Sequence, residues 1–101
     1  MKGLTKLPAN IFALGKFKEL LMLNRQTLQE IPPSIDQLKE ELVKLNLSNN
    51  KRVKKLPASV GDLHKLQNMI LTDCKILESL PSTLNRLHKL SSIDLRGCTN
   101  L

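Results

Sequence analysis

Two histidines and two cysteines carry the most versatile chemistry among the 101 residues of this sequence. His64 and His88 lie in two copies of the same Leu-His-Lys-Leu sequence, and no serine, cysteine or aspartate stands at a spacing that would make either one a catalytic base. Cys74 and Cys98 lack the partners of a zinc site and are too few for the disulfide framework of a secreted domain. The sequence therefore predicts no catalytic residue, no metal site and no cofactor.

A basic cluster, Lys51, Arg52, Lys54 and Lys55, suggests a different chemistry, the binding of anions. The chain has 16 Lys and Arg against 9 Asp and Glu, a formal net charge of +7, which favours acidic partners in general. The absence of Trp and Tyr argues against recognition of nucleic acid by base stacking. We expect the cluster to be a solvated loop, with a basic binder of nucleic acid or an anionic surface as the alternative.

Phased prolines indicate which elements must position these residues. An aliphatic residue followed by proline recurs at intervals of 24, 25 and 24 residues, at Leu7-Pro8, Ile31-Pro32, Leu56-Pro57 and Leu80-Pro81. Apolar residues at helical spacing follow each proline, and proline is tolerated at the start of a helix, so each segment predicts a short helical or 3₁₀ piece. The second copy carries one extra residue, in Lys39-Glu40-Glu41. The chain therefore consists of about four repeats of 24–25 residues.

Each repeat also predicts one short strand. Apolar residues two apart lie on the same side of a strand, and such pairs occur at Leu45/Leu47, Met69/Leu71 and Ile93/Leu95. Asn50, Cys74 and Cys98 follow where the chain turns away, and there an inward polar side chain can hydrogen-bond the turn backbone. Because no coil can bury its own leucines, successive coils must stack with their strands parallel.

These residues resemble the leucine-rich repeat proteins from Leu4 to Leu101. The pattern Leu-x-x-Leu-x-Leu-x-x-Asn/Cys is filled by Leu42, Leu45, Leu47 and Asn50, and again by Leu66, Met69, Leu71 and Cys74. The resemblance implies an α/β fold, a right-handed solenoid in a horseshoe arc. Its short parallel sheet would line the concave face, and loops or short 3₁₀ and helical segments would form the convex face. The stretches "IDLRGCTNL" and "LPASVGDLHKL" further resemble the cytoplasmic repeats of plant nucleotide-binding disease-resistance receptors, and similar repeats occur in effectors of plant-associated bacteria.

The first full coil, "FKELLMLNRQTLQEIP", allows two registers. In one, Phe17, Leu20, Met22 and Leu28 point inward and Arg25 takes the Asn/Cys position. In the other, Leu21 and Leu23 point inward and leave Leu20 and Met22 exposed. We prefer the first, because it requires no insertion or deletion.

Residues between the inward positions of each strand must point out of the concave face, where a partner would bind. The expected contacts form four rows: Glu19, Leu21 and Leu23; Lys44, Asn46 and Ser48; Asn68, Ile70 and Thr72; Ser92, Asp94 and Arg96. Exposed aliphatics at Leu21, Leu23 and Ile70, among polar neighbours, are typical of an interaction site. The alternative is that they are ordinary scattered surface residues.

The chain is expected to be a single domain, residues 1–101, with both ends inside a repeat and without evident caps. It has no apparent signal peptide or apolar segment long enough to span a membrane, so we expect a cytoplasmic protein. Cys74 and Cys98 should lie about 5 Å apart in neighbouring coils, within reach of a disulfide, but inward positions in a reducing compartment favour free thiols.

The predicted function is non-catalytic recognition of a protein partner on the concave face, in plant immune signalling or as an effector. The first alternative is the basic binder described above, using Lys51, Arg52, Lys54 and Lys55. The second is a structural fragment that associates with itself through its uncapped ends.

Overall fold

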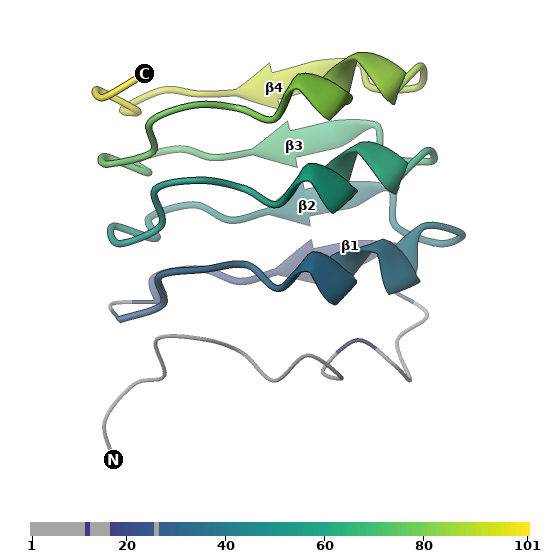
Figure 1. Ribbon diagram of the computed structural model, residues 1–101, viewed down its shortest axis with the longest axis horizontal. Helices are drawn as coiled ribbons and strands as arrows, with labels where there is room; N and C mark the ends of the chain where they lie inside the picture. The colour runs from purple at the N-terminus through teal and green to yellow at the C-terminus, as the bar shows by residue number, and fades with distance from the viewer. Residues whose placement is uncertain (1–11, 13–16, 26) are drawn as a thin grey trace.

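The computed structural model describes residue 12, residues 17–25 and residues 27–101. Within them the chain repeats a unit of strand, turn and 3₁₀ helix, so that the strands form one layer and the 3₁₀ helices form the other (Figure 1). The first of the four proline-led segments, at Leu7-Pro8, lies outside the described residues.

The strand layer is one parallel sheet with its strands in chain order. Its members are β1 (Glu19–Leu21), β2 (Lys44–Asn46), β3 (Asn68–Ile70) and β4 (Ser92–Asp94). The register pairs Leu20 with Leu45, Leu45 with Met69, and Met69 with Ile93. Backbone pairing continues past the strand ends, since the Asn49 N–H donates to the Thr72 carbonyl at 2.8 Å. The predicted solenoid with a parallel sheet is confirmed.

Three 3₁₀ helices cover the other side of the core: η1 (Pro33–Leu38), η2 (Ala58–Asp62) and η3 (Ser82–Arg86). Each follows a proline whose extended backbone sets the direction of entry, at Pro32, Pro57 and Pro81. The proline carbonyl then accepts the first i to i+3 hydrogen bond, at 3.1 Å in every case. The prolines thus precede the helices as caps, one residue earlier than the first helical position.

The core lies between the two layers and is aliphatic. Leu45, Leu66 and Met69 are completely buried, as are their neighbours from the helical side, Ile35 and Val60. Full burial of such a side chain contributes about 1.5–3 kcal/mol. The extra residue of the second repeat falls between η1 and β2, where the N–H groups of Glu41 and Leu42 both donate to the Leu38 carbonyl. The core rows therefore stay in register on both sides of it.

The first full coil adopts the preferred register. Met22 and Leu28 are buried and Leu20 packs against the core, whereas Leu21 and Leu23 are 57% and 40% exposed. The prediction was wrong for Phe17, which is 41% exposed although its equivalents Leu42 and Leu66 are fully buried. Ile93, also placed in the core, is 38% exposed. Both lie in the outermost described coils, which have a described neighbour on one side only.

Candidate functional site

The outer face of the sheet, which points away from the core, carries the predicted partner contacts. All twelve are exposed or half-buried, and none is buried: Glu19, Leu21, Leu23, Lys44, Asn46, Ser48, Asn68, Ile70, Thr72, Ser92, Asp94 and Arg96. The structure therefore places these residues where the alternation predicted. Their role in binding stays a prediction.

The aliphatic residues on this face do not form one patch. Leu21 and Leu23 are well exposed on the first coil, but Ile70 is half-buried two strands away. The register places Asn46 between Leu21 and Ile70. The expectation of three exposed aliphatics acting together is therefore corrected to an apolar pair, Leu21 and Leu23, at one side of the sheet.

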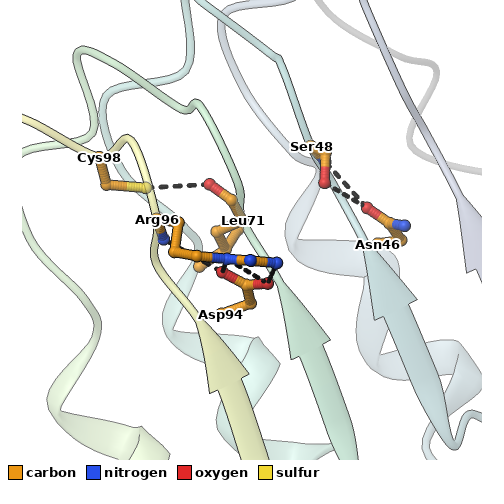
Figure 2. Close-up of polar contacts among 6 residues, drawn as sticks. All are labelled: Asn46, Ser48, Leu71, Asp94, Arg96 and Cys98. Atoms are coloured by element: carbon orange, nitrogen blue, oxygen red, sulfur yellow. Dashed lines mark hydrogen bonds and ion pairs between the residues drawn. The ribbon is translucent and has the colours of Figure 1, made fainter.

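Polar residues on the same face are tied to one another (Figure 2). Asn46 Oδ1 accepts from the Ser48 N–H and hydroxyl, at 3.1 and 2.6 Å. Two coils further on, Asp94 Oδ1 accepts from the Arg96 N–H at 3.1 Å, and Arg96 Nη2 donates to Asp94 Oδ2 at 2.7 Å. Several polar side chains of this face are thus already hydrogen-bonded to one another.

The contact with Arg96 also determines the charge state of Asp94. Hydrogen bonds from the Arg96 side chain, and then from its backbone, lower the pKa of the Asp94 carboxyl from 3.8 to about 2. Asp94 is therefore ionised at any physiological pH, and its charge is largely compensated by the guanidinium beside it.

A shallow groove of about 610 Å³ crosses three strands of the outer face. Six of the predicted contacts line it: Lys44, Asn68, Ile70, Ser92, Asp94 and Arg96. Ser92 Oγ donates to Asn68 Oδ1 at 2.7 Å and Asp94 is paired with Arg96, so much of the polar lining is already satisfied. Within the described residues, no ion pair engages the Lys44 ammonium. The Lys44 ammonium is thus available to a partner in this groove.

The basic cluster lies away from the sheet, on the turn after β2 and the extended segment that leads to η2. Lys51, Arg52, Lys54 and Lys55 are all exposed, whereas Val53 between them is buried as part of the core. This exposure agrees with the expectation of a solvated loop, and a role of the cluster in binding stays a prediction.

The histidines and cysteines are placed by the repeat and not by a shared site. His64 and His88 are both exposed, and His64 Nε2 lies 3.7 Å from Glu40 Oε1 of the preceding coil. No group of three His, Cys, Asp or Glu residues in the described part of the chain is arranged to hold a metal ion.

Asn50, Cys74 and Cys98 fasten each turn to the coil before it. The Cys74 thiol donates to the Leu47 carbonyl at 3.2 Å and the Cys98 thiol to the Leu71 carbonyl at 2.9 Å (Figure 2). Both cysteines are free, but Cys98 is half-buried and not fully buried as expected. Burial raises the pKa of the Cys74 thiol. Asn50 is fully buried and makes more bonds, since Nδ2 donates to the Met22 and Leu47 carbonyls and Oδ1 accepts from the Arg25 N–H.

Sequence reasoning missed a second ladder, one residue before the Asn/Cys position. Asn24, Asn49, Asp73 and Gly97 all have positive φ, between 58° and 81°. Asn, Asp and Gly tolerate this left-handed conformation better than other residues, so each coil turns away from its strand at the same place. The recurrence of these residue types at repeat spacing was the signal that could have identified the ladder.

Comparisons with known proteins agree with this geometry. Residues 41–63 match a sequence family described as Leucine Rich Repeat. Over 56 residues, 55% of this chain, the sequence is 36% identical to a protein of Arabidopsis thaliana named disease resistance protein RPS4. A related Arabidopsis protein, named inactive disease resistance protein RPS4, matches over the same length. The matched stretch covers only 4% of each relative. None of the helices in the described residues has the length and apolar character needed to cross a membrane.

Proposed function

Because the chain is a leucine-rich repeat protein that resembles plant disease-resistance proteins, we propose that it recognises a protein partner on the outer face of its sheet, without catalysis, in plant immune signalling. The observation that carries this proposal is the exposed pair Leu21 and Leu23, on a face where several polar side chains are hydrogen-bonded to one another. A cytoplasmic location is part of the proposal, since the two free thiols suit a reducing compartment.

The outer face offers a partner two kinds of contact. Leu21 and Leu23 would bury apolar surface at one side of the sheet, while the groove beside Lys44 would take polar groups and fix the orientation. Apolar contact in a polar surround is the usual composition of a recognition surface.

The test is affinity capture from nuclease-treated plant lysate with a Leu21→Glu/Leu23→Glu variant. The matched control is Gln37→Glu/Asn85→Glu, which adds the same charge at exposed positions on the helical side. We expect protein partners of the wild type to be lost with the face variant and kept with the control. Partners retained by both variants would show that recognition does not use this face.

Self-association is a second candidate, favoured by the last coil of the described stack. Leu101 is 50% exposed and Ile93 is 38% exposed, whereas their equivalents Leu77 and Met69 are fully buried. Two copies that cover these residues would bury apolar surface. Sedimentation velocity over a range of concentrations distinguishes the candidates, because self-association predicts a rising mass that an Ile93→Asp variant abolishes.

A further inference from the structure

A second groove, the basic groove, lies on the loop side of the solenoid and has no part in the function proposed above. It has a volume of about 590 Å³ and spans three consecutive coils. The middle coil supplies three cations, Arg52, Lys54 and Lys55, and the neighbouring coils supply Ile76 and two carboxylates, Glu30 and Glu78.

The backbone that carries the three cations is anchored to the core and to the next coil, whereas their side-chain nitrogens have no partner among the described residues. Asn50 and Val53 anchor the segment in the core, and the Lys54 carbonyl accepts from the Glu78 N–H at 2.8 Å, which locks it to the next coil. Among the described residues, no ion pair or hydrogen bond engages the side-chain nitrogens of Arg52, Lys54 or Lys55. The groove therefore presents unused donors from a rigid backbone, which is the arrangement that an anion requires.

The distribution of charge favours a compact anion over an extended one. Glu30 and Glu78 stand in the coils on either side of the cations. A polyanion laid along the stack, such as nucleic acid, would meet the Glu78 carboxylate in the following coil. A single anionic group at the middle coil meets the three cations directly. Two further exposed lysines, Lys51 beside Arg52 and Lys75 beside Ile76, add positive charge nearby in the sequence.

A phosphate monoester has the chemistry that this groove suits. It carries roughly −1.5 to −2 charges at neutral pH and three strong acceptor oxygens. The Arg52 guanidinium can take two of those oxygens in a forked contact, while Lys54 and Lys55 act as point charges. The groove is larger than one phosphate, and Ile76 and Gln29 provide an apolar and an amide contact for the chain that carries it.

We propose that the basic groove binds a phosphorylated serine or threonine side chain of a protein segment. The phosphate lies against Arg52, Lys54 and Lys55, and the flanking peptide crosses Ile76. The groove is separate from the outer face of the sheet, so this binding does not depend on the proposed partner contacts at Leu21 and Leu23.

The test uses the full chain and a short peptide that carries a single phosphoserine and no other charged side chain. The same peptide without the phosphate is the comparison. The groove variant is Arg52→Gln/Lys54→Gln/Lys55→Gln. The matched control is Lys39→Gln/Lys65→Gln/Lys89→Gln, which removes the same charge from exposed lysines in the turns that lead into the strands. Binding is measured by fluorescence anisotropy of the labelled peptide, and NMR follows the backbone amide signals of the groove residues.

We expect the Kd to rise by about tenfold or more when the phosphate is removed from the peptide, and by about tenfold or more in the groove variant. In the control variant the Kd should rise by less than about twofold. Equal loss in the two variants would mean that net charge alone attracts the peptide, and the proposal would be wrong. Equal binding of the two peptides would also overturn it.

A short DNA duplex and vesicles containing phosphatidylserine complete the experiment. The Glu78 carboxylate predicts that both bind more weakly than the phosphopeptide at physiological salt. Tighter binding of either, with the steep salt dependence of a polyanion contact, would replace the phosphopeptide by a polyanion and overturn the proposal.

Discussion

At the scale of single residues, Asn50 takes the turn position that Cys74 and Cys98 take in the two following coils, and it makes more hydrogen bonds there than either cysteine. Its side chain satisfies two carbonyls and one amide of the turn backbone, whereas Cys74 and Cys98 each satisfy one carbonyl of the preceding coil. The difference follows from the number of donors and acceptors on each side chain. Arg25, which takes the same position in the first coil, points into solvent, and its amide is satisfied by Asn50.

Replacement of Asn50 should therefore have a graded cost. Asn50→Ala leaves the Met22 carbonyl and the Arg25 amide without this partner and leaves the Leu47 carbonyl with the Cys74 thiol alone, and we expect it to lower the free energy of unfolding by about 2–4 kcal/mol. Asn50→Cys should cost less, because a thiol at this position can still donate to the preceding coil, as Cys74 does. Urea denaturation of both variants measures the difference. Equal costs would contradict the role assigned to the cross-coil bond.

The two thiols should differ in reactivity. Cys74 is 2% exposed and its pKa is raised by burial, so little thiolate is present or accessible at neutral pH, whereas Cys98 is half-buried. We expect iodoacetamide to alkylate Cys98 well before Cys74 in the native protein. Peptide mass spectrometry over a time course gives both rates, and urea-unfolded protein provides the reference in which the rates converge. Faster alkylation of Cys74 would contradict the packing of this turn.

Asp94 should titrate well below an ordinary aspartate. Its pKa is lowered from 3.8 to about 2 by Arg96, so any stability gained from the contact is present above pH 3.8 and is lost as the pH falls through about 2. Arg96→Gln removes the main cause, and we expect the pKa of Asp94 to move back toward 3.8. Carbon-detected NMR of the Asp94 carboxyl group follows this titration in both proteins. An unchanged pKa in the variant would mean that Arg96 is not its cause.

At the scale of elements, consecutive 3₁₀ helices are linked by hydrogen bonds, as consecutive strands are. Ser59 Oγ donates to the Pro33 carbonyl at 2.6 Å and Thr83 Oγ1 to the Ala58 carbonyl at 2.7 Å, so η2 is bonded to η1 and η3 to η2. Gly61 makes the contact between η2 and η3 possible, because a Cβ there would lie 2.4 Å from Thr83 Cβ and 2.6 Å from the Thr83 carbonyl oxygen. The contact between η2 and η3 thus depends on one small residue.

Gly61→Ala should accordingly destabilise the solenoid by forcing η2 and η3 apart. We expect a loss of about 1–3 kcal/mol in thermal or urea unfolding. Adding Thr83→Gly to this variant should restore only part of the loss, because it removes the Cβ and hydroxyl that collide with the new methyl group but leaves the backbone oxygen of residue 83 in place. Full recovery in the double variant would show that the side chain alone sets the spacing.

The elements themselves were predictable from the sequence, because each one repeats. Proline at a fixed phase and leucines two apart determine where the helices and strands occur, and the parallel register follows from stacking. The turn ladder at Asn24, Asn49, Asp73 and Gly97 was not predicted, because its signal is a set of different residue types, Asn, Asp and Gly, whose common property is tolerance of a left-handed backbone. The cross-coil bonds of Ser59 and Thr83 were missed for a similar reason, because they depend on distances between coils.

At the scale of the whole molecule, the sequence predicted which side of the sheet the candidate site lies on, but not how exposed or how paired each of its side chains is. Alternation along a strand states which side a residue faces, and all twelve outward positions are correct in this sense. It does not state how far neighbouring coils cover a residue. Ile70 is therefore half-buried between two coils, and Phe17 and Ile93 stay exposed in the outermost described coils. The pairing of Asp94 with Arg96 is likewise a property of side-chain conformation.

A stack in which each coil contacts only its neighbours should be most stable in its middle. Leu45 and Met69 are fully buried, whereas Ile93 at the equivalent position is 38% exposed. Leu45→Ala should therefore cost about 2–5 kcal/mol, and Ile93→Ala less than half as much. Hydrogen exchange tests the same gradient without mutation, because amides of β2 and β3 should exchange more slowly than those of β4. Uniform protection across the three strands would instead mean that the coils open as one cooperative unit, because all their amides would then exchange through the same opening of the solenoid.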